Sequence, residues 1–221
     1  GQGFALGVEP GVSVDVAGGT ASANFPATTG GAQAVRAGGG DAFAAKLDGT
    51  LTLLSQATYL GGSSGEVAYA LAREDKSGAI FVAGNTGSTN FPGVTGGAQP
   101  APGGGGDAFV ARLDRDLFKL AQATYVGGTS ADVAYALALD ADGAVLVAGD
   151  TASANFPGTA GGAQPARGGG TDAFVARLDG MLAVLHRATY AGGPSDDLAN
   201  ALAVDATGAV YIAGNTRSTA F

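Results

Sequence analysis

The stretch ALALDADGAVLVAGDT, residues 136–151, contains two short apolar runs separated by a turn. Short runs rich in β-branched residues and bounded by turn residues are typical of β-strands, and the frequent glycines leave no apolar stripe of helical period. Gly143 ends the turn that Asp140 begins, and a glycine there supplies the conformation that a tight hairpin requires. The stretch therefore predicts an antiparallel strand pair, and similar turns at residues 75–78 and 205–208 predict two more.

This hairpin is one part of a repeat that fills the chain. The Asp-Ala-Phe triplet that begins at Asp41 returns at Asp107 and Asp172, a spacing of 66 and then 65 residues. The motifs Ala-Thr-Tyr, Asn-Phe-Pro and Gly-Gly-Ala-Gln also return, and the one extra residue lies between Leu71 and Gly78. About three and a half copies account for the 221 residues, so the repeat leaves no room for a separate domain.

Each copy contains four short apolar runs, which in the second copy are residues 67–72, 80–84, 108–113 and 120–126. Four strands in a unit of this kind predict an all-β fold, a β-propeller of four-stranded antiparallel blades. The repeat is longer than a common blade because a connection of about twenty residues follows its second strand. We expect one propeller fragment over residues 1–221, with blades at approximately 1–62, 63–128 and 129–193 and a partial blade at 194–221.

The motifs ALALDADGAVLVAGDT, NFP, GGAQ, GGGTDAFVARLD and ATYAGG together resemble the SBBP family of bacterial β-propeller repeats. The resemblance covers nearly the whole chain and rests on the order of the motifs. It implies propeller blades within large exported or surface proteins, and it implies no defined activity for any residue. The first copy departs from the pattern because its first turn is Glu9-Pro10-Gly11.

Composition and charge exclude several classes of protein. The 19 acidic and 11 basic residues give a net charge of −8, which argues against nucleic acid and against an anionic membrane surface as partners. No apolar run is long enough to predict a membrane span. The chain has no cysteine and one histidine, so it predicts neither a disulfide framework nor a thiolate or multi-histidine metal site, and we expect no cofactor.

The long connection carries the candidate ligand residues, because asparagine and glutamine return there in every copy. Its phenylalanine is expected to anchor the loop, on the same end of the fold as Gly61-Gly62 and Gly127-Gly128. The candidates on the predicted ligand face are Asn24, Asn90, Asn155, Gln33, Gln99 and Gln164.

Other recurring residues have both a structural and a functional interpretation. The carboxylates of Asp41, Asp107 and Asp172 either gather around a cation or accept N–H bonds within their own turns, and the turn interpretation is favoured because repeats hold equivalent residues far apart. Packing explains the rest better than a site does. These residues are Phe43, Phe109 and Phe174, expected to be buried; Tyr59, Tyr125 and Tyr190, expected to pack between blades; and Lys46, Arg112 and Arg177, expected as rim charges or pairs between repeats.

The repeats contain no nucleophile with an adjacent base, so we expect no enzyme. The function that the sequence favours is a non-catalytic module of a bacterial exported or cell-surface protein, acting as a scaffold or as an adhesion or interaction element. A carbohydrate-binding propeller is the alternative, and a polysaccharide-processing enzyme is a third. The expected partners are a protein or glycan at the cell surface and further blades, supplied by a continuation of the polypeptide past Phe221 or by a second copy of the chain.

Overall fold

The computed structural model describes residues 1–9 and 11–221, so Pro10 of the first predicted turn lies outside the described residues. The described chain is all β. Its fourteen strands are β1 (Gln2–Glu9), β2 (Ser13–Thr20), β3 (Asp41–Asp48), β4 (Leu54–Leu60), β5 (Glu66–Arg73), β6 (Ile80–Thr86), β7 (Asp107–Leu113), β8 (Leu120–Val126), β9 (Asp132–Leu139), β10 (Val145–Thr151), β11 (Asp172–Leu178), β12 (Leu185–Ala191), β13 (Asp197–Val204) and β14 (Val210–Thr216).

The strands form three four-stranded sheets and one strand pair, and every neighbour is antiparallel. We name them the first sheet (β1–β4), the second sheet (β5–β8), the third sheet (β9–β12) and the terminal pair (β13–β14). Strand order follows chain order throughout, as the meander predicted from the sequence requires. None of the elements in the described residues is a helix that could cross a membrane.

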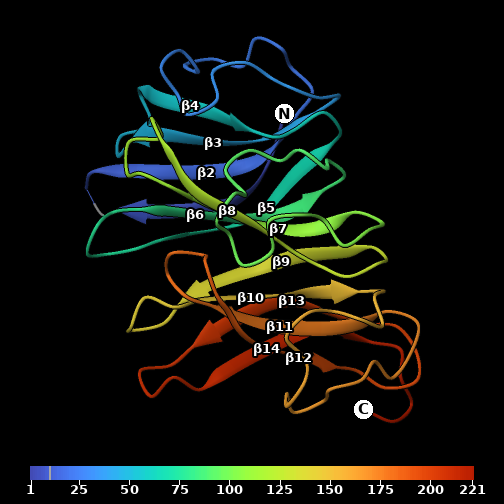
Figure 1. Cartoon of the computed structure of the whole chain (residues 1–221). Helices are drawn as coiled ribbons and strands as arrows, with labels where there is room; N and C mark the ends of the chain where they lie inside the picture. Colours follow the sequence, from blue (N-terminus) through green and yellow to red (C-terminus); the bar gives the residue numbers. More distant parts are fainter. Residues whose placement is uncertain (10) are drawn as a thin grey trace.

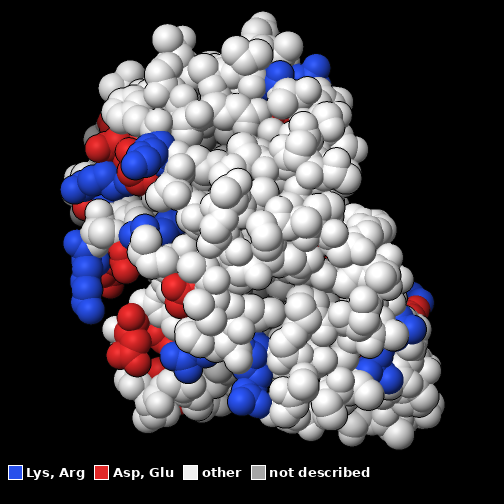
Figure 2. Space-filling model, in the orientation of Figure 1, with Lys and Arg blue, Asp and Glu red and all other residues white. Residues whose placement is uncertain are grey.

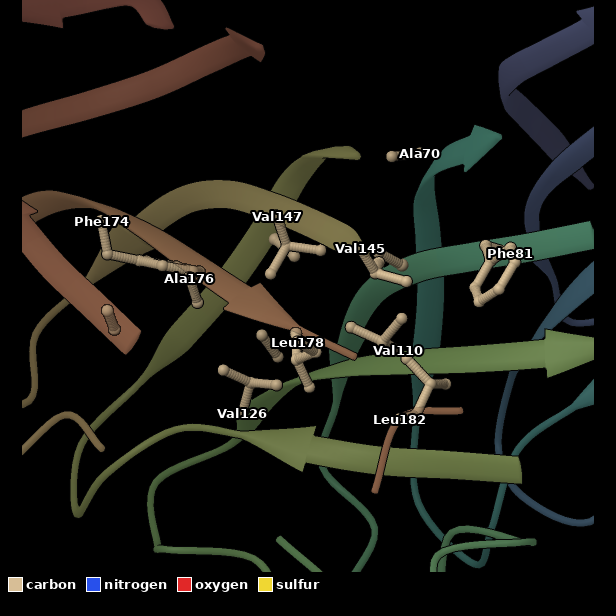
Figure 3. Packing of buried hydrophobic residues seen from close by; sticks show 14 of the residues in the cluster. Ala70, Phe81, Val110, Val126, Val145, Val147, Phe174, Ala176, Leu178 and Leu182 are labelled. Atoms are coloured by element: carbon tan, nitrogen blue, oxygen red, sulfur yellow. The ribbon is translucent and has the colours of Figure 1, made fainter. Parts of the chain in front are cut away.

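The sheets lie one upon another from the N-terminus to the C-terminus (Figure 1). Their first strands, β1, β5, β9 and β13, are neighbours in space. The core lies between the sheets: Phe109 of β7 belongs to a buried cluster that includes Leu60 of the first sheet, and Phe174 of β11 belongs to a buried cluster that includes Val110 of the second sheet. Figure 3 shows the second of these layers. Phe43, Phe109 and Phe174 are all buried, which confirms the prediction for these positions.

Each first strand contains a β-bulge, which the sequence analysis did not predict. In β5 the pairing with β6 skips Tyr69, because Ala68 pairs with Gly84 and Ala70 pairs with Ala83. A Cβ on Gly84 would collide with the carbonyl oxygen of Val67, so the bulge requires a glycine opposite it. A bulge re-aims the side chain of its extra residue. The extra residues are Phe4, Tyr69, Tyr135 and Asn200, and the opposing glycines are Gly18, Gly84, Gly149 and Gly214.

The hairpin turns explain why one repeat is a residue longer. In the third sheet the N–H of Gly143 donates to the carbonyl of Asp140, three positions back. In the second sheet the N–H of Gly78 donates to the carbonyl of Glu74, four positions back, so this turn accommodates the extra residue. Both glycines have a positive φ, 83° and 74°. The hairpins predicted from these glycines are therefore confirmed.

The hairpin end of the stack carries most of the ion pairs. Figure 2 shows charged side chains gathered along the edge where Figure 1 has the β1–β2 and β5–β6 hairpins. Lys46 pairs with Asp15 at 2.8 Å and Arg177 pairs with Asp140 at 2.7 Å, in each case within one sheet. The expectation of pairs between repeats was therefore wrong for these two residues, because a strand of the same sheet supplies the partner. Arg177 is 48% exposed, as expected for a rim charge, whereas Lys46 is largely buried. Arg73 does join two sheets, since it contacts Glu9 at 2.6 Å.

Candidate functional site

A tyrosine of the fourth strand binds the Asn-Phe-Pro loop of its own sheet by hydrogen bonds. The N–H of Phe91 donates to the Tyr125 hydroxyl at 2.9 Å, and that hydroxyl donates to the carbonyl of Ser88 at 2.8 Å. The ring of Phe91 lies 4.6 Å from that of Phe109. Burial raises the pKa of the Tyr125 hydroxyl. The tyrosines were expected to pack between sheets, and Tyr125 does so, but the bond of its hydroxyl to the loop was not predicted.

The asparagines of this loop bind the connection that precedes their own sheet. Asn90 Oδ1 accepts bonds from the N–H and from the hydroxyl of Ser63, both at 2.9 Å. Asn155 Oδ1 accepts the same two bonds from Thr129, both at 3.0 Å. Ser63 and Thr129 lie between consecutive sheets, so each of these asparagines joins two sheets. Asn24 is exposed and makes no such bond among the described residues.

The glutamines bind the connection that leaves their own sheet. Gln99 Oε1 accepts from the N–H of Gly127, and its Nε2 donates to the carbonyl of the same residue, both at 3.0 Å. Gln164 makes the same pair of bonds to Gly192. Gln33 Oε1 accepts from the N–H of Gly61, while its Nε2 donates to Asp41. Five of the six predicted ligand residues therefore hold loops, on the end of the fold where the sequence predicts them.

A leucine turn supplies a second link between sheets that sequence reasoning missed. Leu117 has a φ of +62° and is fully buried, and its carbonyl accepts a bond of 2.9 Å from the N–H of Ala32 in the preceding sheet. Leu182, with a φ of +59°, binds Ala98 in the same way. A positive φ is uncommon for leucine, which is why sequence patterns do not predict this turn. The equivalent Leu51 has a φ of +58° and is 63% exposed.

The recurring aspartates cap their own turns, which confirms the structural interpretation. Asp107 Oδ2 accepts from the N–H of Gly103 at 2.7 Å, and Asp172 accepts from Gly168 and Gly169 at 2.7 and 3.0 Å. Among the described residues, no group of three or more histidine or acidic side chains could hold a metal ion. His186 lies exposed in β12, the outer strand in which the sequence places it.

The aromatic residues of the bulges form a row along the first strands, which we name the axial row (Phe4, Tyr69 and Tyr135). The ring centroids of Phe4 and Tyr69 are 5.4 Å apart, and those of Tyr69 and Tyr135 are 5.2 Å apart. Burial, with smaller contributions from Asp150 and Tyr69, raises the pKa of Tyr135 to about 12. The Tyr135 hydroxyl therefore remains protonated at neutral pH and can donate a hydrogen bond.

The axial row borders a hollow in the described part of the chain. It has a volume of about 640 Å³ and is lined by Phe4, Tyr69, Val67, Glu66 and Asn85, among others. The Oδ1 atom of Asn85 is buried and has no hydrogen-bond partner. An aromatic surface beside an amide can stack on an apolar ring face while the amide binds a hydroxyl group. An aromatic residue at one position of an otherwise alanine-rich strand was the sequence signal for this row.

A comparison of the sequence with models of known protein families gives no match, and a comparison with curated proteins gives no significant match.

Proposed function

We propose that this chain is a non-catalytic β-propeller repeat module of a bacterial exported or cell-surface protein, where it acts as a structural scaffold or as an adhesion or interaction element. The stacking of four-stranded meanders with adjacent first strands supports the propeller assignment. The resemblance of the motifs to SBBP repeats supports the assignment to exported or surface proteins.

One observation carries the scaffold proposal: two of the recurring asparagines and two of the recurring leucine turns join one copy to the next. Asn90 binds Ser63, and Asn155 binds Thr129, across two successive junctions. Leu117 and Leu182 repeat a second link at the same junctions. Each repeat of such an array stabilises its neighbours, so the product is a rigid array of repeats.

The scaffold proposal is tested by placing the chain between a surface anchor and a reporter domain on a bacterial cell. The expected result is that the native chain keeps the reporter accessible to a large antibody, whereas a Phe109→Ala, Phe174→Ala double variant, which loses core packing at two junctions, does not. A matched variant of two exposed residues, Phe118→Ala and Met181→Ala, is expected to behave as the native chain does. Equal accessibility in all three would contradict the proposal, as would turnover of a polysaccharide by the purified native chain.

The axial row favours carbohydrate binding as a second candidate function. Its rings, the hollow beside them and the unpartnered oxygen of Asn85 form a surface suited to a sugar ring. Glycan-array binding by the purified chain is the test. We expect Tyr69→Ala to abolish binding, and Tyr211→Ala to leave it unchanged, because Tyr211 is 59% exposed on β14 and lies outside the row. Binding to no glycan, or equal binding by both variants, would contradict this function.

A further inference from the structure

The junction between the second and third sheets brings two buried carboxyl groups together. Asp107 begins β7 and Asp132 begins β9, and each is 1% exposed. Gly127 lies between them: a Cβ on this residue would be 2.5 Å from Asp107 Oδ1 and 2.7 Å from Asp132 Oδ2. The two oxygen atoms therefore lie beside Gly127 and are at most 5.2 Å apart, and glycine is required there because any side chain would displace a carboxyl group.

The hydrogen bonds of the two carboxyl groups differ. Asp132 has three hydrogen-bond donors. Its Oδ2 accepts from the N–H of Gly128 at 2.8 Å and from the Ser153 hydroxyl at 2.9 Å, and its Oδ1 accepts from the Thr151 hydroxyl. Asp107 Oδ2 accepts from the N–H of Gly103 at 2.7 Å, and the backbone of Gly104 is a further donor to this carboxyl group, but Oδ1 accepts no well-aligned hydrogen bond. A buried carboxylate oxygen beside a second carboxylate is costly unless something positive lies between them.

Further acidic groups act on the surroundings of this pair. The charges of Asp107 and Glu66 add to burial in raising the pKa of Tyr125, and burial, with a smaller contribution from the charge of Asp132, raises the pKa of Asp150 to about 6. The guanidinium of Arg167, in the third sheet's long loop, binds the carbonyls of Ala152 and Gly170. None of the ion pairs in the described residues includes Asp107 or Asp132.

We propose that Asp107 and Asp132 form a carboxylic acid–carboxylate pair that retains one proton in the folded protein, with a hydroxyl at Oδ1 of Asp107 donating to Asp132. The proton gives Oδ1 of Asp107 a well-aligned hydrogen bond and removes one of two adjacent charges. No bond other than the hydrogen bond forms, and the proton comes from solvent when the chain folds.

The same geometry occurs at the junction before it. A Cβ on Gly61 would collide with Glu66 Oε2 and would lie 2.7 Å from the carboxyl carbon of Asp41. Burial raises the pKa of Glu66, and the charge of Asp41 adds a smaller contribution in the same direction. Asp172 and Asp197 meet around Gly192, but there the donors to Asp197 outweigh burial and its pKa is lowered. The retained proton is therefore assigned to the two inner junctions.

The consequence is that the junction between the second and third sheets is more stable at acidic pH. Burial and, to a smaller extent, the charge of Asp132 raise the pKa of Asp107 to about 6, against 3.8 for an ordinary aspartate. The folded protein thus binds a proton that the unfolded chain releases, so this contribution to stability is fully present below pH 3.8 and is lost as the pH rises through about 6. Above that pH the pair is unprotonated and the junction weakens.

The test compares urea-unfolding midpoints between pH 4.5 and 8 for the native chain and Asp107→Asn. In the variant, the carboxamide oxygen can still accept from Gly103 and the Nδ2–H group replaces the proton. We expect the native midpoint to fall as the pH rises, and the variant midpoint to fall less and to exceed the native value at pH 8. Asp116→Asn, a change at an exposed turn residue, is expected to keep the native profile. Identical profiles for the native chain and Asp107→Asn would overturn the proposal.

Two further measurements decide the remaining alternatives. If a cation occupies the gap, calcium or magnesium chloride will raise the native midpoint at pH 8 and this rise will be absent in Asp107→Asn; that outcome overturns the proposal, and no rise supports it. Infrared spectra compare the native protein with Asp107→Asn, because burial also raises the pKa of Asp150 to about 6 and that group contributes a protonated carboxyl band of its own. A protonated carboxyl band at pH 5.5 that is present in the folded native chain, weaker in Asp107→Asn and lost on unfolding supports the retained proton, and equal bands in the two folded proteins contradict it.

Discussion

Leu117 and Leu51 occupy the same position in equivalent turns and have nearly the same φ, 62° and 58°, yet Leu117 is fully buried and Leu51 is 63% exposed. The difference is made by the neighbouring sheet alone. The second sheet inserts Leu117 against the first sheet, whereas no described residue covers Leu51. The two leucines therefore separate the cost of a strained turn from the benefit of contact between sheets.

Replacing Leu117 with alanine is expected to lower the free energy of unfolding by about 2–5 kcal/mol, because a buried leucine is lost. The same change at Leu51 is expected to alter it by about 0.5 kcal/mol or less, since the residue is exposed and its backbone conformation is unchanged. Equilibrium urea unfolding measures both. Equal losses at the two positions would show that the turn, and not the contact between sheets, accounts for the effect.

Phe109→Ala is expected to cost about 3–5 kcal/mol, because this ring is fully buried between the first and second sheets and packs against Phe91. Phe118, which is 56% exposed, provides the control, and Phe118→Ala is expected to have a small effect. A loss below about 1 kcal/mol for Phe109→Ala in reversible unfolding would place the core elsewhere.

Tyr125→Phe removes one oxygen atom and leaves the ring in place. The buried N–H of Phe91 then has no acceptor, and the carbonyl of Ser88 loses its donor. We expect a loss of about 1–3 kcal/mol, the usual cost of an unsatisfied buried donor. Tyr211→Phe, at an exposed position, is the matched control. If both variants unfold at the native urea concentration, the tyrosine hydroxyl does not fasten the loop.

Acid is expected to destabilise two exposed turns, whereas it stabilises the junction that contains Asp107 and Asp132. Hydrogen bonds from Thr50, and also from the backbone of Leu53, lower the pKa of Asp48 to about 2, and those from Thr207 and Ala209 do the same for Asp205. The contribution of each carboxylate is present above the ordinary pKa of 3.8 and is lost as the pH falls through about 2. Asp48→Asn should reduce the loss of stability between pH 4 and 2, measured by thermal unfolding. An equal loss of stability between pH 4 and 2 in the native chain and in Asp48→Asn would contradict this role of Asp48.

Much of the fold could be predicted because its signals are local. The period of the repeat, the glycines of the turns at Gly78 and Gly143 and the short apolar runs each act over a few residues, and they predict the strands and their order. The capping role of Asp107 was predicted for the same reason. The observed strands extend one or two residues beyond the apolar runs, since polar ends such as Thr86 still pair with the neighbouring strand.

The features that the sequence did not predict depend on contacts between copies. Asn90 was a candidate ligand residue because nothing in its own loop shows that Ser63, 27 positions earlier, lies beside it. The axial row depends on a bulge in each first strand, and the strands must converge before Phe4 and Tyr69 can meet. The retained proton requires Asp107 and Asp132 to face one another across Gly127, a relationship that no single motif encodes.

The central claim is that asparagines of the long loop join one sheet to the next, and the comparison of Asn90→Ala with Asn24→Ala tests it most directly. Asn90 accepts two bonds from Ser63 across a junction, whereas Asn24 stands at the same place in its repeat and makes none among the described residues. In equilibrium urea unfolding we expect Asn90→Ala to cost about 1–3 kcal/mol and Asn24→Ala to change the free energy by about 0.5 kcal/mol or less. Equal effects of the two substitutions would contradict the claim.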